Sequence, residues 1–265
     1  MTTAAPRSTP PTAKRVSLRH ELHGDARDDD YYWLRDREDP DTLRYLEAEN
    51  EHADAATAHL AGLRETLYGE MLARVKQDDE EAPYPWGGWL YYYRTAEGKQ
   101  YRLYCRSRPG GPEQVILDLN EIAREHGYVR LYALEPSPDH SLLAYSVDTS
   151  GNEEMSVRVK DLATGAVLPD CIENATFGLE WANDNRTLFY CGHDASKRAD
   201  KVMRHVLGTD AASDVVVLRE DDERYSLGLE RTASGRYLRL RSAGKVSSEE
   251  WLLDADRPGG EAWLF

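Results

Sequence analysis

Apolar residues recur every three or four positions between about residues 40 and 72, a spacing that places them on one face of an α-helix. The stripe consists of Leu43, Leu46, Ala53, Ala56, Leu60, Leu63, Leu67 and Met71. Pro40, with Asp39 before it as a capping residue, favours a helix start. Gly62 and Gly69 leave open whether the segment forms one long helix or two shorter ones. In either case the stripe needs a partner surface, because helices draw most of their stability from packing.

After Pro83 and Pro85 the pattern changes to short runs rich in Tyr, Val, Leu and Trp that are separated by turn residues. The first of these runs are WLYYYRTA, YRLYCRSR and QVILDL, with EGKQ and PGGP between them. Such runs predict antiparallel β-strands joined by hairpins.

An internal repeat organises these strands. The segments SPDHSLLAYS, ANDNRTLFYC and TASGRYLRLR each pass from a polar turn into a strand, and they align Asp139, Asp184 and Ser234 at separations of 45 and 50 residues. The second half of each unit is a strand, a turn and a strand, and the turns contain or adjoin Gly110, Gly165, Gly208 and Gly259. Two hairpins in a unit of about 50 residues are typical of a β-propeller blade. A β-sandwich would explain the strands but not the length of the unit.

The patterns together predict a mainly β chain in three zones. Residues 1–12 are a Thr/Ala/Pro-rich tail that we expect to be disordered, residues 13–82 are an N-terminal extension with the amphipathic helix or helices, and residues 83–265 are an incomplete β-propeller. Four-stranded antiparallel blades are expected near residues 86–122, 130–172, 175–220 and 225–265. Because blades are stable when each packs on both neighbours, a chain of about four blades that ends at Phe265 looks cut short.

Composition narrows the class of partner. The chain carries 48 acidic and 33 basic side chains, a formal net charge of −15, which argues against nucleic-acid and membrane-surface partners. Its three cysteines form no C-x-x-C pair, so we expect buried, reduced thiols rather than a disulfide framework or a zinc site. The opening residues lack the apolar core of a signal peptide, and no later run is long enough to span a bilayer. We therefore expect a cytoplasmic protein.

Three stretches carry a family resemblance. HGD at residues 23–25 is followed by YYWLRD at 31–36, YLEAEN occupies 45–50, and SPDHSLLAYSVDTSGNEEMSVRVKDLATG occupies 137–165. These stretches resemble the prolyl oligopeptidase family of serine peptidases, and within it the oligopeptidase B branch. The resemblance covers essentially everything after residue 13.

The resemblance implies a seven-bladed propeller, of which about four blades are present here, that caps an α/β-hydrolase domain absent from this chain. In the family the hydrolase domain carries a Ser–Asp–His triad that cuts short peptides, after Arg or Lys in oligopeptidase B and after Pro in prolyl members.

No catalytic, cofactor-binding or metal-binding residue is predicted in this chain, and no cofactor is expected. A hydrolase-fold nucleophile lies in a G-x-S-x-G turn, and the sequence contains no such pentapeptide; the nearest serine context is Ser234, in a blade turn. We expect His23 to anchor its segment by a hydrogen bond, and Asp148 to shape a turn. The acidic runs at residues 28–30 and 78–81 lack the spacing of a calcium loop and are expected to be solvated.

The leading hypothesis is the N-terminal propeller region of a serine oligopeptidase that cleaves short basic peptides after Arg or Lys. On this hypothesis the chain is inactive alone, its partner is a C-terminal hydrolase domain in cis or on a separate chain, and the propeller restricts access to the active site. One alternative is a stand-alone propeller module that binds peptides or proteins. A further alternative is one half of a split peptidase.

Overall fold

The computed structural model describes residues 9–265, in two compact units that divide between Lys76 and Gln77. Residues 1–8 of the predicted tail at 1–12 lie outside the described residues. The first unit opens with a two-stranded antiparallel hairpin, β1 (Leu18–Leu22) and β2 (Asp25–Asp29), and a 3-10 turn at Tyr32–Arg35 follows it.

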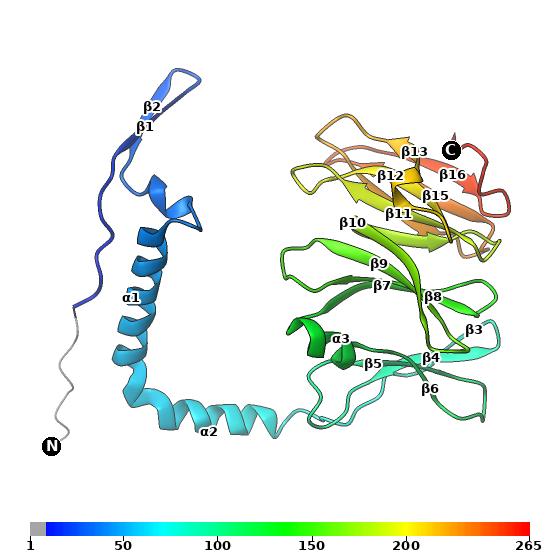
Figure 1. The fold of residues 1–265 in the computed structure, drawn as a ribbon, viewed down its shortest axis with the longest axis horizontal. Coiled ribbons are helices and arrows are strands. Elements are labelled where there is room, and N and C mark those ends of the chain that lie inside the picture. The colour runs from blue at the N-terminus through cyan, green and yellow to red at the C-terminus, as the bar shows by residue number, and fades with distance from the viewer. Residues whose placement is uncertain (1–8) are drawn as a thin grey trace. The chain divides into compact units, whose positions relative to one another are not determined.

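The helical segment forms two helices, α1 (Pro40–Thr57) and α2 (Ala61–Leu72), joined by a 3-10 turn at Ala58–Leu60 where the chain bends (Figure 1). The Asp39 carboxylate accepts a hydrogen bond from the backbone N–H of Asp41 at 2.6 Å, so Asp39 caps α1 as predicted. The break does not fall at a glycine, because Gly62 lies in the first turn of α2. Across residues 9–265, no helix combines the length and the apolar character that crossing a bilayer requires.

The unit from Gln77 to Phe265 consists mainly of antiparallel sheet. Its first sheet is the first blade and contains, in spatial order, β3 (Tyr84–Trp86), β4 (Trp89–Arg94), β5 (Leu103–Ser107) and β6 (Gln114–Asp118). A helix that the strand pattern did not predict, α3 (Leu119–His126), then leads toward the second blade. Asp118 caps its start through the N–H of Asn120 at 2.8 Å, and Gly127 ends it at a φ of 76°.

The second sheet has seven strands and contains two blades. Its members, in chain order, are β7 (Arg130–Pro136), β8 (Leu142–Asp148), β9 (Met155–Asp161), β10 (Val167–Trp181), β11 (Thr187–His193), β12 (Ala199–Val206) and β13 (Val215–Arg219). The long strand β10 pairs with β9 through its first half and with β11 through its second half, and Ala175 pairs with residues of both neighbours. It is therefore the last strand of the second blade and the first strand of the third.

The last sheet is the fourth blade, with strands β14 (Ser226–Arg231), β15 (Tyr237–Ala243), β16 (Ser248–Asp254) and β17 (Trp263–Leu264). In Figure 1 the three sheets of residues 77–265 follow one another face to face. The predicted fold class is confirmed: the chain is mainly β, with four-stranded antiparallel blades after an N-terminal helical segment.

Apolar cores lie between successive blades rather than inside any one of them. The first and second blades enclose a core that includes Tyr91, Ile116 and Leu143. The second and third enclose Val157 and Trp181, and the third and fourth enclose cores built from Phe189, Leu240 and their neighbours. Burying these side chains contributes roughly 1.5–3 kcal/mol each, so a blade depends on its neighbour for most of its stability.

The expected burial of the cysteines holds for Cys105 and Cys191, whereas Cys171 is partly exposed; all three are free thiols.

His140 locks the first blade to the second. Its side chain is 8% exposed, its Nδ1 lies 2.8 Å from the hydroxyl of Tyr91, and its ring contacts Trp86 edge-on at 4.8 Å. A Cβ atom placed on Gly87 would lie 1.7 Å from His140 Nε2, so the imidazole fills the space that a side chain at the β3–β4 turn would need. Burial lowers the pKa of His140, and the positive charge of Arg106 adds to the effect.

We predict that Gly87→Ala lowers the free energy of unfolding by about 2–4 kcal/mol, because it adds a clash with His140 to the strain of a positive φ. Gly98 is the matched control, since it also has a positive φ but has open space around its Cβ position. Gly98→Ala should cost about 1–2 kcal/mol from backbone strain alone. Denaturant unfolding of both variants measures the difference. Equal losses in the free energy of unfolding would contradict the role of His140 in holding the first two blades together.

Candidate functional site

The first strands of the second, third and fourth blades, which are β7, the second half of β10, and β14, lie side by side. This is the row of strands that faces the axis in a propeller. Consecutive members are tied by side-chain bonds to backbone carbonyls. The indole N–H of Trp181 donates to the carbonyl of Glu135 at 2.7 Å, and the guanidinium of Arg231 donates to the carbonyl of Trp181 at 2.7 Å. This row is the candidate site because it also contains two titratable side chains, Glu135 and Glu180, with shifted pKa values.

Two glutamates in the row, Glu135 on β7 and Glu180 on β10, have strongly raised pKa values. Burial is the largest cause for both, and for Glu135 the charge of Glu180 adds to it, while the charge of Arg231 opposes the shift. The pKa of Glu135 rises to about 8 and that of Glu180 to about 7. Carboxyls with pKa values near neutrality are typical of functional positions, although structural pairs also produce them.

The sequence analysis missed this pair, but a signal for it is present in the repeat. Each blade from the second to the fourth has a Leu–Glu dipeptide just before its polar turn, at residues 134–135, 179–180 and 229–230. The dipeptides recur at the same 45- and 50-residue separations as the aligned turns. Leu179 and Leu229 are buried and Leu134 is partly buried, so the dipeptide marks the same position in the first strand of each of these blades.

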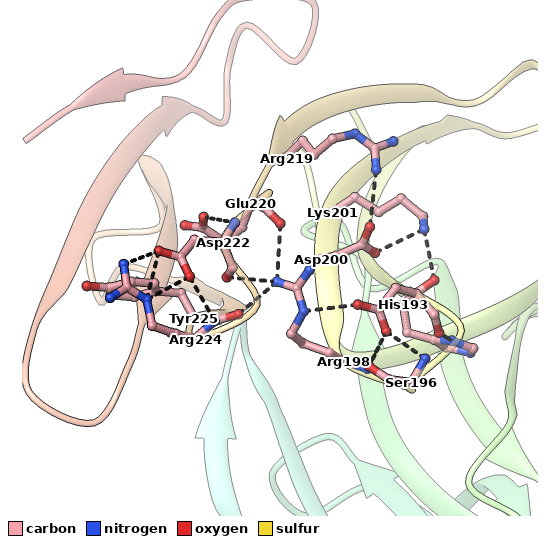
Figure 2. A network of polar contacts seen from close by, with 11 residues as sticks. His193, Ser196, Arg198, Asp200, Lys201, Arg219, Glu220, Asp222, Arg224 and Tyr225 are labelled. Carbon is pink, nitrogen blue, oxygen red and sulfur yellow. Dashed lines mark hydrogen bonds and ion pairs between the residues drawn. The ribbon is translucent and has the colours of Figure 1, made fainter. Parts of the chain in front are cut away.

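A second polar cluster joins the third and fourth blades (Figure 2). Arg198, with a side chain 14% exposed, donates from Nε to the Asp194 carboxylate at 3.0 Å. Its Nη1 donates to the carbonyls of Glu220, Asp222 and Tyr225 at 3.2, 3.3 and 2.8 Å. One guanidinium therefore holds the β11–β12 turn against the linker between β13 and β14.

The remaining groups of this cluster are also paired. The Asp200 carboxylate accepts hydrogen bonds from Lys201 at 3.0 Å and Arg219 at 3.1 Å, and Lys201 also donates to the carbonyl of His193 (Figure 2). The hydroxyl of Ser196, together with backbone N–H donors and Arg198, lowers the pKa of Asp194 to about 2. Because these carboxylates accept hydrogen bonds from donors held in fixed positions, the cluster is suited to holding the third and fourth blades together.

The structure places the residues singled out from the sequence as follows. Asp148 accepts backbone N–H bonds from Ser150, Gly151 and Glu153 at 2.7 to 2.9 Å, which confirms its turn-shaping role. Burial alone would raise the pKa of Asp148, but these hydrogen bonds outweigh it and the pKa is lowered. Ser234 lies in the turn after β14, with its hydroxyl 3.1 Å from that of Thr232.

The N-terminal residues of interest lie in the β1–β2 hairpin. His23 occupies its exposed turn with a φ of 54°, and no hydrogen bond from its side chain is present among the described residues. Asp28 and Asp30 lie near Arg19 and Arg15 at 3.8 and 3.5 Å. Within residues 9–265, no three His, Cys, Asp or Glu side chains are grouped so that they could hold a metal ion.

The apolar stripe of the helical segment packs little within residues 9–76. Its large apolar members have exposed fractions between 39% and 59%, and they are Leu43, Leu46, Leu60, Leu63, Leu67 and Met71. Large apolar side chains exposed along helices in this way are typical of a segment that packs against another surface.

Comparison with known proteins identifies the family. Residues 10–264 match the model of the prolyl oligopeptidase N-terminal β-propeller domain. The chain is 38% identical to dipeptidyl aminopeptidase BI of Pseudoxanthomonas mexicana over 97% of its length, and 35% identical to protease 2 of Moraxella lacunata over 94%. Oligopeptidase B from Leishmania major superposes with a TM-score of 0.90 at 29% identity over 97% of the chain. The chain spans 38%, 37% and 39% of the lengths of these three proteins.

We predict that Arg198→Ala lowers the free energy of unfolding by about 3 kcal/mol, because it removes a charged donor and leaves several partly buried oxygens without a partner. Arg224→Ala is the matched control, because Arg224 belongs to the same linker but its side chain is 81% exposed and pairs with Asp222. The control should leave stability unchanged within error. Hydrogen exchange should also show the 220–225 linker exchanging faster in Arg198→Ala, and an unchanged linker would contradict its role.

Proposed function

The chain belongs to the prolyl oligopeptidase family through its N-terminal β-propeller domain, and from this we propose that it is the propeller region of a serine oligopeptidase that cleaves short peptides after Arg or Lys. The family match over residues 10–264 carries the proposal. The 35% identity to protease 2 and the similarity to oligopeptidase B structures support the branch.

In this proposal the chemistry belongs to a C-terminal hydrolase domain, in cis or on a separate chain, which supplies a Ser–Asp–His triad. The serine attacks the scissile carbonyl while the histidine takes its proton. The propeller contributes no reacting group. It narrows the path to the triad so that short peptides enter and folded proteins do not, and the net charge of −15 attracts basic peptides. We place the protein in the cytoplasm.

A second candidate has a specific observation in its favour. The relative with 38% identity is named a dipeptidyl aminopeptidase, a name that describes removal of dipeptides from a free amino terminus. An enzyme of that kind would require the substrate's terminal ammonium group, whereas an oligopeptidase would accept a blocked amino terminus. The two candidates therefore differ in one chemical group of the substrate. The stand-alone binding module and the split peptidase stay open as further alternatives.

We predict that the natural gene product, purified from its own cells with an antibody to residues 40–72, cleaves an amino-blocked peptide amide after Arg. Fluorophosphonate, which reacts with an activated serine, should abolish the cleavage. A matched blocked substrate with Pro in place of Arg is the specificity control. Cleavage of unblocked dipeptide amides alone would favour the second candidate, and no cleavage of any of these substrates would contradict both.

We also predict that the 265-residue chain alone has no amidase activity on the same Arg substrate, because its sequence contains no G-x-S-x-G nucleophile turn. Circular dichroism would first establish that the sample is folded. Turnover that is sensitive to fluorophosphonate would contradict this prediction. Activity that appears when a separately expressed second half is added would instead favour a split peptidase.

A further inference from the structure

His205, on β12 of the third blade, lies between two carboxylates in the protein interior. Its Nδ1 is 2.7 Å from Oδ1 of Asp214, and its Nε2 is 3.2 Å from Oδ1 of Asp170. The three side chains are almost completely buried, with exposed fractions of 1% for His205, 1% for Asp214 and 6% for Asp170. Each ring nitrogen therefore faces a carboxylate that is shielded from solvent.

The cluster joins the second blade to the third. Asp170 lies in the first half of β10, the last strand of the second blade, and its Oδ1 also accepts the backbone N–H of Gly208 at 2.5 Å. His205 and Gly208 belong to the third blade, in and just after β12, and Asp214 immediately precedes β13. The bond between Trp181 and Glu135 ties the first strands of the same two blades, so Asp170 and His205 supply a second tie at their later strands.

The neighbouring donors show that both carboxylates act as acceptors. The hydroxyl of Tyr190, on β11, donates to Oδ2 of Asp214 at 2.9 Å. Burial, this hydrogen bond and the charge of Asp214 all raise the pKa of Tyr190, so the phenol keeps its proton. A neutral imidazole has a single N–H, whereas an imidazolium has two. Hydrogen bonds from His205 to both acceptors therefore require the imidazolium.

Other charged side chains on the surrounding strands are paired elsewhere. They are Arg204 on β12, bonded to the carbonyl of Pro258; Glu173 on β10, near Arg158 of β9; Asp210, which caps the 3-10 turn before β13; and Asp200, Lys201 and Arg219, which belong to the cluster of Figure 2. Within residues 9–265, the ion pairs of Asp170 and Asp214 are with His205. A buried carboxylate is costly without a cation, so the cluster favours a protonated ring.

We propose that His205 is a buried imidazolium that holds the second blade to the third through Asp170, and that loss of its Nε2 proton breaks this contact. In the neutral ring, Nδ1 keeps its proton because its contact with Asp214 is the shorter one. The Nε2 lone pair then faces the Asp170 carboxylate, and the two repel each other. The inference rests on the geometry of this cluster and does not depend on the proposed peptidase function.

The proposal makes this blade junction sensitive to alkaline pH. A histidine in the unfolded chain loses one proton at about pH 6.5. Above that pH a folded state that holds the imidazolium binds one proton more than the unfolded chain, so stability falls as the pH rises. The fall ends once the folded ring is neutral. Below about pH 6.5 the stabilisation is complete, because the histidine is protonated in both states.

Nitrogen-15 NMR of the full chain, labelled at histidine, tests the protonation state directly. At pH 7 both ring nitrogens of His205 should give signals of protonated nitrogen, each coupled to its own hydrogen. The signals are assigned through bonds to the His205 backbone, so the measurement needs no variant. An unprotonated Nε2 at pH 7 would overturn the proposal.

The pH dependence is tested by the midpoint temperature of unfolding, Tm, between pH 6 and pH 9. The wild-type Tm should fall by roughly 3–5 °C per pH unit while the ring loses its proton. Asp170→Asn should flatten this fall, because an amide can donate a hydrogen bond to the neutral ring. Glu173→Gln is the matched control and should keep the wild-type slope, because Glu173 lies on the same strand but its side chain is 65% exposed. Equal slopes in all three proteins would overturn the proposal.

Discussion

The packing of each blade against the next is the interaction on which the rest of this structure depends. The apolar cores of residues 77–265 lie between blades, so the buried faces of Leu143, Trp181 and Leu240 are complete only when a neighbouring sheet is in place. Each β-sheet exposes two faces, and a sheet with one covered face would leave a large apolar surface in water. Strand β10 reinforces this dependence, because it continues from one blade into the next without a break.

Polar side chains fix how the blades meet. His140 fills the space beside the glycine turn of the first blade, Arg231 bonds to carbonyls of the third blade, and Arg198 bonds to the linker before the fourth. In each case a long or planar side chain from one blade satisfies backbone oxygens or a ring of another. Such bonds contribute about 1–3 kcal/mol each and, unlike apolar burial, they have a direction. They therefore select one orientation of the blades from the many that apolar contact would permit.

These contacts are consistent with the proposal that a hydrolase domain carries out the reaction while the propeller restricts access to it. In the clusters around Arg198 and Arg231 the guanidinium groups are bonded to internal acceptors, and the two glutamates with raised pKa values, Glu135 and Glu180, lie on the first strands of neighbouring blades. A region built in this way supplies shape and charge rather than a reacting group. The apolar stripe of the helical segment suits a second role, attachment to another surface.

The sequence by itself determined the elements that depend on local pattern. The two-hairpin repeat predicted the antiparallel blades, the three-to-four spacing and Asp39 predicted the helix start, and the turn role of Asp148 followed from its neighbours. It did not predict α3, although the Asp118 cap and Gly127 were available as signals, nor the partial exposure of Cys171. The tertiary structure alone decided that Glu180 accepts a hydrogen bond from the backbone N–H of Arg231 and that the strand of Glu180 lies beside the strand of Glu135. Their encounter depends on three strands separated by 45 and 51 residues, and the pKa of a carboxyl depends on the charges and the burial that such distant strands bring to it.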